Sequence, residues 1–180
     1  MPKWSNPPLV VYHGTDTAAL GLAPPPQHTV LHAFTVNLAR CSPNTDFGRG
    51  FYMTTSDHQA REWANKRVRL AHSRGRSTTG VVLSFPVSLY ALSTLESLCF
   101  VRATADYYAL VEDCRLGFPP HQKTVGNVAY DVVFGPVSLG SQRLVIHDCD
   151  QISFHTPAAV AVLPGPQVYD VGDPISGLFS

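Results

Sequence analysis

The stretch from Asp46 to Ala71 constrains the fold more than any other part of this sequence. It opens with a turn that contains two glycines, continues into a short strand from Phe51 to Thr54, and runs into a helix. Ser56, followed three residues later by Gln59, is the capping pattern that satisfies backbone N–H groups at a helix start. Small and apolar residues then recur at helical spacing, and Gly75 is placed to end the helix.

The rest of the chain reads as short strands with one further helix, from Ala105 to Leu116, capped by Thr104 and stopped by Gly117. Strands are predicted at Leu9 to Tyr12, Gly80 to Tyr90, Val128 to Phe134, Leu144 to His147 and Gln151 to His155. Several short strands with helices inserted early predict an α+β fold: a split antiparallel β-sheet core with two or more flanking helices. We expect one domain over residues 9–163, a short N-terminal extension (residues 1–8), and a loose Pro/Gly-rich tail (residues 164–180).

Composition argues against several classes of partner. Thirteen basic side chains balance thirteen acidic ones, so the chain carries no strong electrostatic signature for nucleic acid or for an anionic membrane. No apolar stretch approaches the roughly 20 residues that span a bilayer, and Met1 to Pro8 lacks the apolar core of a secretory signal. We therefore expect a cytoplasmic or nuclear protein with no membrane partner. The histidines and cysteines show no metal-ligand spacing, so no metal is expected.

The first cluster with chemical potential is His13-Gly14-Thr15, which follows Tyr12 at the end of the first predicted strand. A histidine there brings a side-chain donor near a ligand, and a glycine lets bare backbone approach because it has no Cβ. Taken alone, such a tripeptide is more often an ordinary turn.

Two further clusters lie later in the chain. Residues 46–55 combine the two-glycine turn with adjacent aromatic side chains, which alone are more often core than a ligand platform. Residues 150–156 read DQISFHT, and strand alternation puts Gln151, Ser153 and His155 on one face.

Together these clusters resemble the ADP-ribosyltransferase superfamily, in the His-Tyr branch that diphtheria-type toxins and poly(ADP-ribose) polymerases share. That branch carries His-Gly-Ser/Thr on the first strand and Phe-Gly-x-Gly-x-Tyr on a later one, and both patterns are intact here as HGT and FGRGFY. The similarity is greatest to a little-characterised group of small stand-alone domains with YHG, DFGxGFY and QISFH motifs. It covers roughly Leu9 to Leu163.

The resemblance implies that NAD is the substrate. His13 would donate a hydrogen bond to a ribose hydroxyl, the backbone of Gly14 would pair with the nicotinamide carboxamide, and Thr15 would support that amide. Tyr52 would stack on the cationic nicotinamide ring, and Phe47 would close the other side.

The resemblance also places the third catalytic residue on the late strand, where most members keep a glutamate. Here the position holds Gln151, which gives an H-Y-Q triad of His13, Tyr52 and Gln151. An amide orients a hydroxyl but carries no charge and is no useful base, so transfer to a protein side chain is disfavoured relative to cleavage by water. If a Gln151→Glu variant creates or strengthens transfer to protein, the assignment of this late-strand position is right.

The sequence thus predicts an NAD-dependent ADP-ribosyl enzyme (a glycosyltransferase in the broad sense) that cleaves the nicotinamide–ribose bond. It is either a mono-ADP-ribosyltransferase or an NAD glycohydrolase (NADase). Two alternatives stay open: a catalytically inactive NAD- or ADP-ribose-binding module, and an RNA 2′-phosphotransferase-like enzyme, against which the neutral charge and the intact tyrosine motif argue. The acceptor, whether a protein side chain, a nucleic acid or water, is not readable from the sequence.

Overall fold

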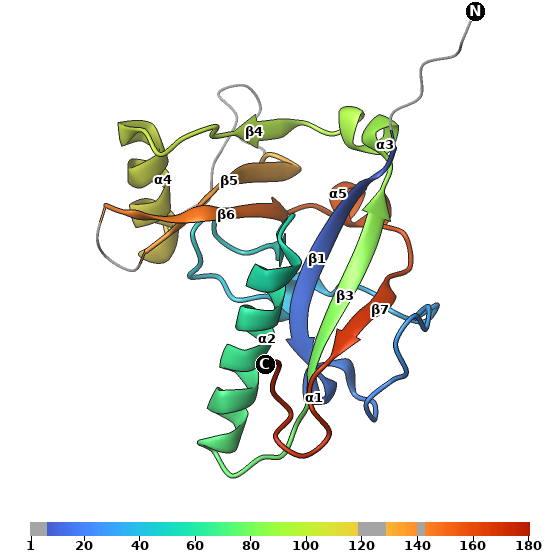
Figure 1. Cartoon of the computed structure of the whole chain (residues 1–180). Helices are drawn as coiled ribbons and strands as arrows, with labels where there is room; N and C mark the ends of the chain where they lie inside the picture. Colours follow the sequence, from blue (N-terminus) through green and yellow to red (C-terminus); the bar gives the residue numbers. More distant parts are fainter. Residues whose placement is uncertain (1–6, 119–128, 140–142) are drawn as a thin grey trace, which may run out of the picture. The chain divides into compact units, whose positions relative to one another are not determined.

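The computed structural model describes residues 7–118, 129–139 and 143–180 (Figure 1). Its strands form a three-stranded sheet in the order β1-β3-β7 and a four-stranded sheet in the order β2-β6-β5-β4. The β1–β3, β3–β7 and β5–β6 pairs are antiparallel, whereas β4 and β5 run parallel. The described helices are α1 (Thr17–Leu20), α2 (Asp57–His72), α3 (Leu89–Ser93), α4 (Ala105–Arg115) and α5 (Pro157–Ala161), with a 3-10 turn η1 (Leu38–Arg40). The predicted α+β class with a split, mostly antiparallel sheet is confirmed.

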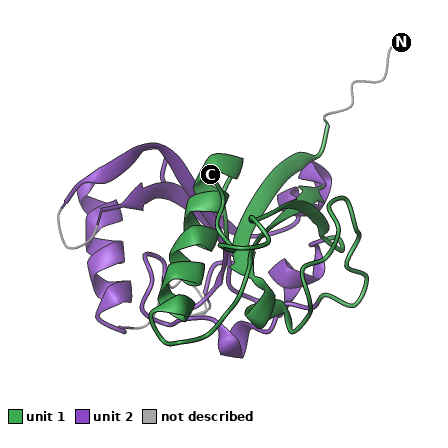
Figure 2. Cartoon of the chain, turned by 60° about the horizontal axis from the view of Figure 1, so that its bottom comes forward, with its two compact units in different colours: residues 1–34, 53–87, 164–180 green, residues 35–52, 88–163 purple. Residues whose placement is uncertain are grey.

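The chain divides into two compact units, and neither is continuous in sequence (Figure 2). Unit 1 consists of residues 1–34, 53–87 and 164–180, and unit 2 consists of residues 35–52 and 88–163. Because each unit is assembled from separate stretches, its core depends on contacts between residues far apart in the chain.

Unit 1 holds β1 (Leu9–Asp16), β3 (Gly80–Val87) and β7 (Gln167–Val171), with α2 lying along β1 (Figure 1). Apolar side chains of β1 and β3 are buried, including Val11, Leu83 and Phe85. Gly14 is the point of closest approach to α2: a Cβ at this position would lie 1.9 Å from the carbonyl oxygen of Ala60. Glycine is therefore required for the strand and the helix to pack at this spacing.

The predicted capped helix is confirmed as α2. Ser56 Oγ accepts a hydrogen bond from the Gln59 amide at 3.2 Å, which is the forward half of the capping pattern. The Gln59 side chain does not return to Ser56; it accepts from Thr54 Oγ1 at 2.8 Å, and Thr54 Oγ1 in turn accepts from the Ser56 amide at 3.0 Å. The helix ends at His72, and Gly75 takes a left-handed conformation (φ +69°) just beyond it.

The loose tail expected from residue 164 onward is wrong for the folded chain. Residues Gln167–Val171 form β7, which pairs with β3, and Val168 is fully buried. Farther on, the Phe179 backbone amide donates to Asn65 Oδ1 at 2.7 Å, and Asn65 Nδ2 donates back to the Phe179 carbonyl at 3.1 Å. A five-residue strand flanked by proline and glycine gives little periodic signal, so its pairing with β3 was not visible in the sequence. Residues 1–6 of the expected N-terminal extension lie outside the described residues.

Most of the second sheet belongs to unit 2: β2 (Phe51–Met53, whose last residue is assigned to unit 1), β4 (Ser97–Cys99), β5 (Val132–Ser138) and β6 (Val145–Phe154). The two late strands predicted from the sequence are one strand, β6. Its register with β5 shifts between Pro136 and Val137, and Asp148 has a φ of +57°, so a bulge interrupts the alternation. The strand predicted from Val128 begins at Val132, and Val128 itself lies outside the described residues.

The core of unit 2 is aromatic. Phe47, Tyr107, Val111 and Val133 are buried together, and α4 supplies two of these four side chains. Helix α4 follows its predicted cap, with Thr104 Oγ1 accepting from the Tyr107 amide at 3.4 Å and Gly117 left-handed just past its end. Among residues 7–118, 129–139 and 143–180, no helix has both the length and the apolar character needed to cross a bilayer.

Candidate functional site

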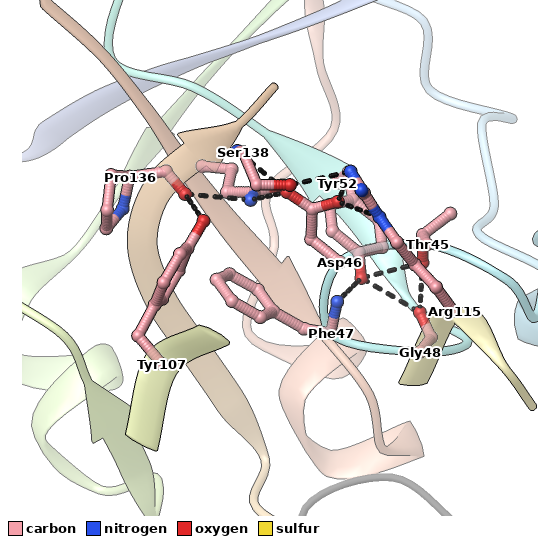
Figure 3. Close-up of polar contacts among 10 residues, drawn as sticks. Thr45, Asp46, Phe47, Gly48, Tyr52, Tyr107, Arg115, Pro136 and Ser138 are labelled. Atoms are coloured by element: carbon pink, nitrogen blue, oxygen red, sulfur yellow. Dashed lines mark hydrogen bonds and ion pairs between the residues drawn. The ribbon is translucent and has the colours of Figure 1, made fainter. Parts of the chain in front are cut away.

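Tyr52, on β2, closes the turn formed by residues 45–48 (Figure 3). Its hydroxyl oxygen accepts from the Phe47 amide at 2.8 Å, donates to the Gly48 carbonyl at 2.9 Å, and lies 2.8 Å from Thr45 Oγ1. Gly48 has a φ of +77°, a conformation that glycine adopts without strain. Burial raises the pKa of the Tyr52 phenol far above its usual range, so the hydroxyl stays protonated and fixes the ring.

Phe47 supports the Tyr52 ring from behind. The two rings stack with centroids 6.4 Å apart and an interplanar angle of 19°. Phe47 has no exposed surface and also contacts Phe100 and Tyr107, so it is a core side chain. In this conformation it presents no surface to a ligand, so it cannot make the expected contact with a nicotinamide ring.

Asp46 is the anion at the centre of the polar cluster in Figure 3. Its Oδ1 accepts from Arg115 Nε at 3.0 Å and from Arg115 Nη2 at 2.6 Å. Its Oδ2 accepts from the Ser138 amide at 3.0 Å and from Gln151 Nε2 at 2.7 Å. One carboxylate thus joins the turn to α4, β5 and β6, and charge-assisted bonds of this kind are the strong ones.

Gln151, on β6, is held by its amide nitrogen. Nε2 donates to Asp46 Oδ2 and, at 2.9 Å, to the carbonyl of Pro136, which also accepts from Tyr107 Oη at 2.8 Å. Both of these neighbours are acceptors, so the amide orientation follows from the chemistry. Gln151 is 8% exposed, and no hydrogen bond reaches its Oε1 from the part of the chain that the structure describes.

His155 forms a second polar group beside the Tyr52 ring, at a centroid distance of 6.4 Å. Its Nδ1 lies 2.8 Å from the Arg49 carbonyl, which can only accept, so the ring proton sits on Nδ1. Burial lowers the pKa of His155 to about 4, and the Arg49 carbonyl opposes that shift without cancelling it. Nε2 is then an acceptor 2.7 Å from Ser153 Oγ; Ser153 has no exposed surface, which removes it as a nucleophile.

Gly50, the second glycine of the turn, packs against the imidazole of His155. A Cβ at this position would lie 2.8 Å from His155 Cε1 and 3.1 Å from the Phe154 carbonyl oxygen, so glycine lets the imidazole pack there without displacement. Arg49, between the two glycines, donates from Nη1 to the carbonyls of Ala39 at 2.8 Å and Cys41 at 2.7 Å. Its guanidinium thus fastens the preceding segment to the turn.

The remaining predicted residues, His13, Gly14 and Thr15, lie on β1 in unit 1. At the edge of β1 away from β3, the Tyr12 amide donates to the Thr54 carbonyl at 2.7 Å and the Thr54 amide donates back at 3.0 Å. Backbone groups alternate sides along a strand, so the N–H and C=O of Gly14 point to this same edge. Neither has a hydrogen bond within residues 7–118, 129–139 and 143–180.

The side chain of His13 points to the sheet face opposite α2, because its neighbour Gly14 faces the helix. His13 is half-buried and Thr15 is buried on the same face. The structure therefore gathers the predicted residues into two groups. Phe47, Tyr52 and Gln151 meet in unit 2, while His13, Gly14 and Thr15 stay in unit 1, and the triad itself stays a prediction.

Sequence reasoning missed Asp46 and Arg115. An acidic residue directly before a Phe-Gly turn reads as a solvated turn residue, and 69 positions separate it from its cation.

Asp150, the carboxylate next to Gln151, instead lines an open depression with Arg102 and residues 145–149. No three His, Cys, Asp or Glu side chains of the described residues are grouped as metal ligands.

Comparison with known proteins gives a family but no activity. Residues 28–164 match the DUF3990 family, described as a protein of unknown function. The match includes the segments with Tyr52 and Gln151 and begins after His13. No curated protein and no solved structure matches the chain.

Proposed function

We propose that this chain, which belongs to the DUF3990 family, is an NAD-dependent ADP-ribosyl enzyme that cleaves the nicotinamide–ribose bond. The motif order that resembles the His-Tyr branch of ADP-ribosyltransferases is the starting point of the proposal. The observation that carries it is the backbone edge at Gly14, directly beside His13, whose N–H and C=O have no hydrogen bond among the described residues.

The Gly14 edge suits a carboxamide. A primary amide has one carbonyl acceptor and two N–H donors, so it pairs with a backbone N–H and C=O much as a neighbouring strand does. Tyr12 already pairs with Thr54 on the same edge, so pairing at Gly14 would extend that pattern by one step. The missing side chain of Gly14 makes room for α2, so a planar group would approach the N–H and C=O in the plane of the sheet.

Tyr52 is prepared to act through its ring alone. Its hydroxyl is held by Phe47 and Gly48 within its own turn, so the phenol is not offered as an acid or base. Phe47 packs behind the ring. A ring fixed in this way stacks on cationic nicotinamide with little further loss of conformational entropy.

Gln151 offers an acceptor. Because Asp46 and Pro136 occupy both directions of its amide nitrogen, Oε1 is the atom available to a ribose hydroxyl. A catalytic glutamate would accept from the same hydroxyl, so the hydrogen-bond polarity is kept while the charge is lost. Positive charge builds on the ribose as nicotinamide leaves. A ribose hydroxyl that donates to Oε1 becomes more polarised in that transition state, so the hydrogen bond strengthens and lowers the activation barrier of bond cleavage.

Hydrolysis is favoured over transfer to a weakly nucleophilic protein side chain. Transfer of that kind needs a general base, and Gln151 is not one. Within unit 2, the imidazole of His155 is neutral but its Nε2 already faces Ser153. Water and acceptors that are nucleophilic without deprotonation remain as substrates for the oxocarbenium-like species.

The proposal is tested by incubating the purified chain with NAD and quantifying free nicotinamide and ADP-ribose by chromatography. We expect nicotinamide release, with ADP-ribose in equal amount if water is the acceptor and a shortfall if a macromolecule is modified. Tyr52→Ala should lose most of the release, and Tyr90→Ala, on a largely exposed side chain, is the matched control that should not.

Absence of nicotinamide release, with and without cell extract as a source of acceptors, would overturn the enzymatic proposal. NAD binding by calorimetry in that case would identify the inactive binding module instead. Cleavage of RNA 2′-phosphate with NAD consumption would identify the phosphotransferase alternative.

A further inference from the structure

We propose that Asp46 is the positioning residue for Gln151: its carboxylate turns the amide so that only Oε1 is presented, and it requires a neutral donor at position 151. The claim about position 151 stands on the geometry of unit 2. Its kinetic consequence rests on the proposed NAD cleavage.

Both carboxylate oxygens of Asp46 accept two hydrogen bonds. Four donor contacts reach its two oxygens, from Arg115 Nε and Nη2, the Ser138 amide and Gln151 Nε2. Asp46 is 8% exposed, so these bonds replace its lost hydration. An asparagine at this position would turn an amide NH₂ toward at least one of these donors.

Position 151 is lined by acceptors. Asp46 Oδ2 lies 2.7 Å and the Pro136 carbonyl lies 2.9 Å from Gln151 Nε2. A group with two N–H donors satisfies both, whereas a carboxylate would oppose both with lone pairs. A glutamate enters this position only in its protonated form, which has one donor.

The charges of the surroundings do not relieve this conflict. The titratable side chains on the elements that meet here are Asp106, Tyr107, Tyr108, Glu112, Asp113, Cys114 and Arg115 on α4, Tyr52 on β2, and His147, Asp148, Cys149 and Asp150 on β6, with His155 directly after β6. Burial raises the pKa of Tyr107 and Tyr52 and lowers that of His155, so these three are neutral near pH 7. Arg115 is the cation that contacts Asp46, and both Asp46 Oδ1 bonds already belong to it.

The geometry therefore argues against a gain of transfer in Gln151→Glu. The resemblance suggested that a glutamate would restore transfer, but here it would meet the Asp46 carboxylate. Desolvation and that like charge raise the pKa of the introduced glutamate. A raised folded-state pKa means that stability is present at low pH and is lost as pH rises through that pKa.

The test is a double-mutant cycle in the full chain. Urea unfolding is measured from about pH 5 to about pH 8 for wild type, Asp46→Asn, Gln151→Glu and the double variant. We expect Gln151→Glu to lose stability relative to wild type as pH rises. The double variant should show a clearly smaller pH-dependent loss, because the opposing charge is gone. Equal pH dependence in the single and double glutamate variants would overturn the proposal.

A readout on the wild-type chain keeps the test decisive if Asp46→Asn fails to fold. In a ¹⁵N-labelled sample, the two Gln151 side-chain amide protons should exchange with solvent slowly and give two separate shifted resonances, since both are donated. Fast exchange, with shifts like those of an exposed glutamine, would contradict the geometry on which the proposal depends.

Kinetics separate positioning from a merely structural role. If the chain cleaves NAD, Asp46→Asn should lower kcat about tenfold to hundredfold while KM changes much less, because the Gln151 contact strengthens in the transition state. Asp16→Asn is the matched control, since Asp16 is also a buried carboxylate bound to an arginine, with Arg67 Nε at 2.6 Å. It should lose stability with kcat unchanged.

Failure of the two proposals is distinguishable. If wild type releases no nicotinamide, the proposed function fails, and the unfolding cycle and the amide exchange still decide whether Asp46 positions Gln151. If wild type is active and folded Asp46→Asn keeps its kcat, the positioning role fails and the proposed function stands.

Discussion

The turn around Asp46 and Tyr52 and the edge of β1 at Gly14 manage their polar groups in opposite ways. In the turn, the carboxylate and the phenol bond to groups within unit 2, so the side chains are locked before any ligand arrives. At the edge of β1, the backbone of Gly14 is turned outward beyond the last strand partner. The difference separates a preorganised region, the turn, whose polar groups are bonded internally, from a strand edge at which no described residue bonds to the Gly14 N–H or C=O.

The largest loss of stability is expected from a substitution at Gly14. Gly14→Ala would place a methyl group 1.9 Å from the Ala60 carbonyl oxygen, and backbone on both sides leaves no flexible group to yield. We expect a loss of about 3 kcal/mol or more in the free energy of unfolding, with α2 displaced. Gly165→Ala, whose nearest neighbour would be 3.7 Å away, is the control within unit 1. Equal unfolding midpoints in urea for the two variants would refute the close packing.

In the turn, the substitution expected to cost most stability is at Arg115, the cation that contacts Asp46. Arg115→Met leaves the buried Asp46 carboxylate without its counter-charge, and we expect a loss of about 2 kcal/mol, since the arginine is 30% exposed and partly screened. Arg143→Met, which removes an exposed pair with Glu112 on the same helix, should change stability far less. Denaturant unfolding of both variants measures the difference, and a reversed order would contradict the role given to Asp46.

The pH dependence of stability tests the burial of His155, whose imidazole packs against Gly50. His155 is neutral when folded, with a pKa of about 4, and titrates near its usual 6.5 when unfolded. Because the folded-state pKa is lowered, this contribution to stability is complete above about pH 6.5 and is lost as pH falls toward about 4. The size is on the order of 1 to 3 kcal/mol. His155→Gln should abolish this part of the pH profile, and an unchanged profile would show that the imidazole is not buried.

The smallest effect separates the Tyr52 ring from its hydroxyl. Tyr52→Phe removes the acceptor of the Phe47 amide and the donor to Gly48, which should lower stability by about 1 kcal/mol. NAD cleavage should persist, since the ring remains for stacking. Measured side by side, Tyr52→Ala should lose both. A Tyr52→Phe variant as inactive as Tyr52→Ala would mean that the hydroxyl takes part in the reaction.

The sequence predicted what local rules determine. The α2 cap at Ser56 and the α4 cap at Thr104 need only neighbours within one turn, and both helices form as expected. The glycines at 48 and 50 were recognised as a turn, but the reason for Gly50 is His155, 105 positions later.

What could not be predicted depends on distant partners. The strand β7 exists because β3 accepts it, and the single strand β6 hides behind a bulge at Asp148 that breaks its alternation. Asp46 was missed because its four donors come from Arg115, Ser138 and Gln151, all at least 69 positions away. The motifs indicated Tyr52 and Gln151 as candidates, whereas the hydrogen bonds of Gln151 to Asp46 and Pro136 join residues too far apart in sequence to be predicted.

Binding of the nicotinamide carboxamide at the Gly14 edge of β1 is tested most directly by the amide resonance of Gly14. It is followed in a ¹⁵N-labelled chain titrated with nicotinamide and, separately, with NAD. We expect a saturable downfield shift of the Gly14 N–H resonance with both ligands, because this amide gains an acceptor, while the amide resonance of Gly165 does not move. A Gly14 resonance that does not move at ligand concentrations that saturate binding or turnover would contradict the claim that this edge receives the carboxamide.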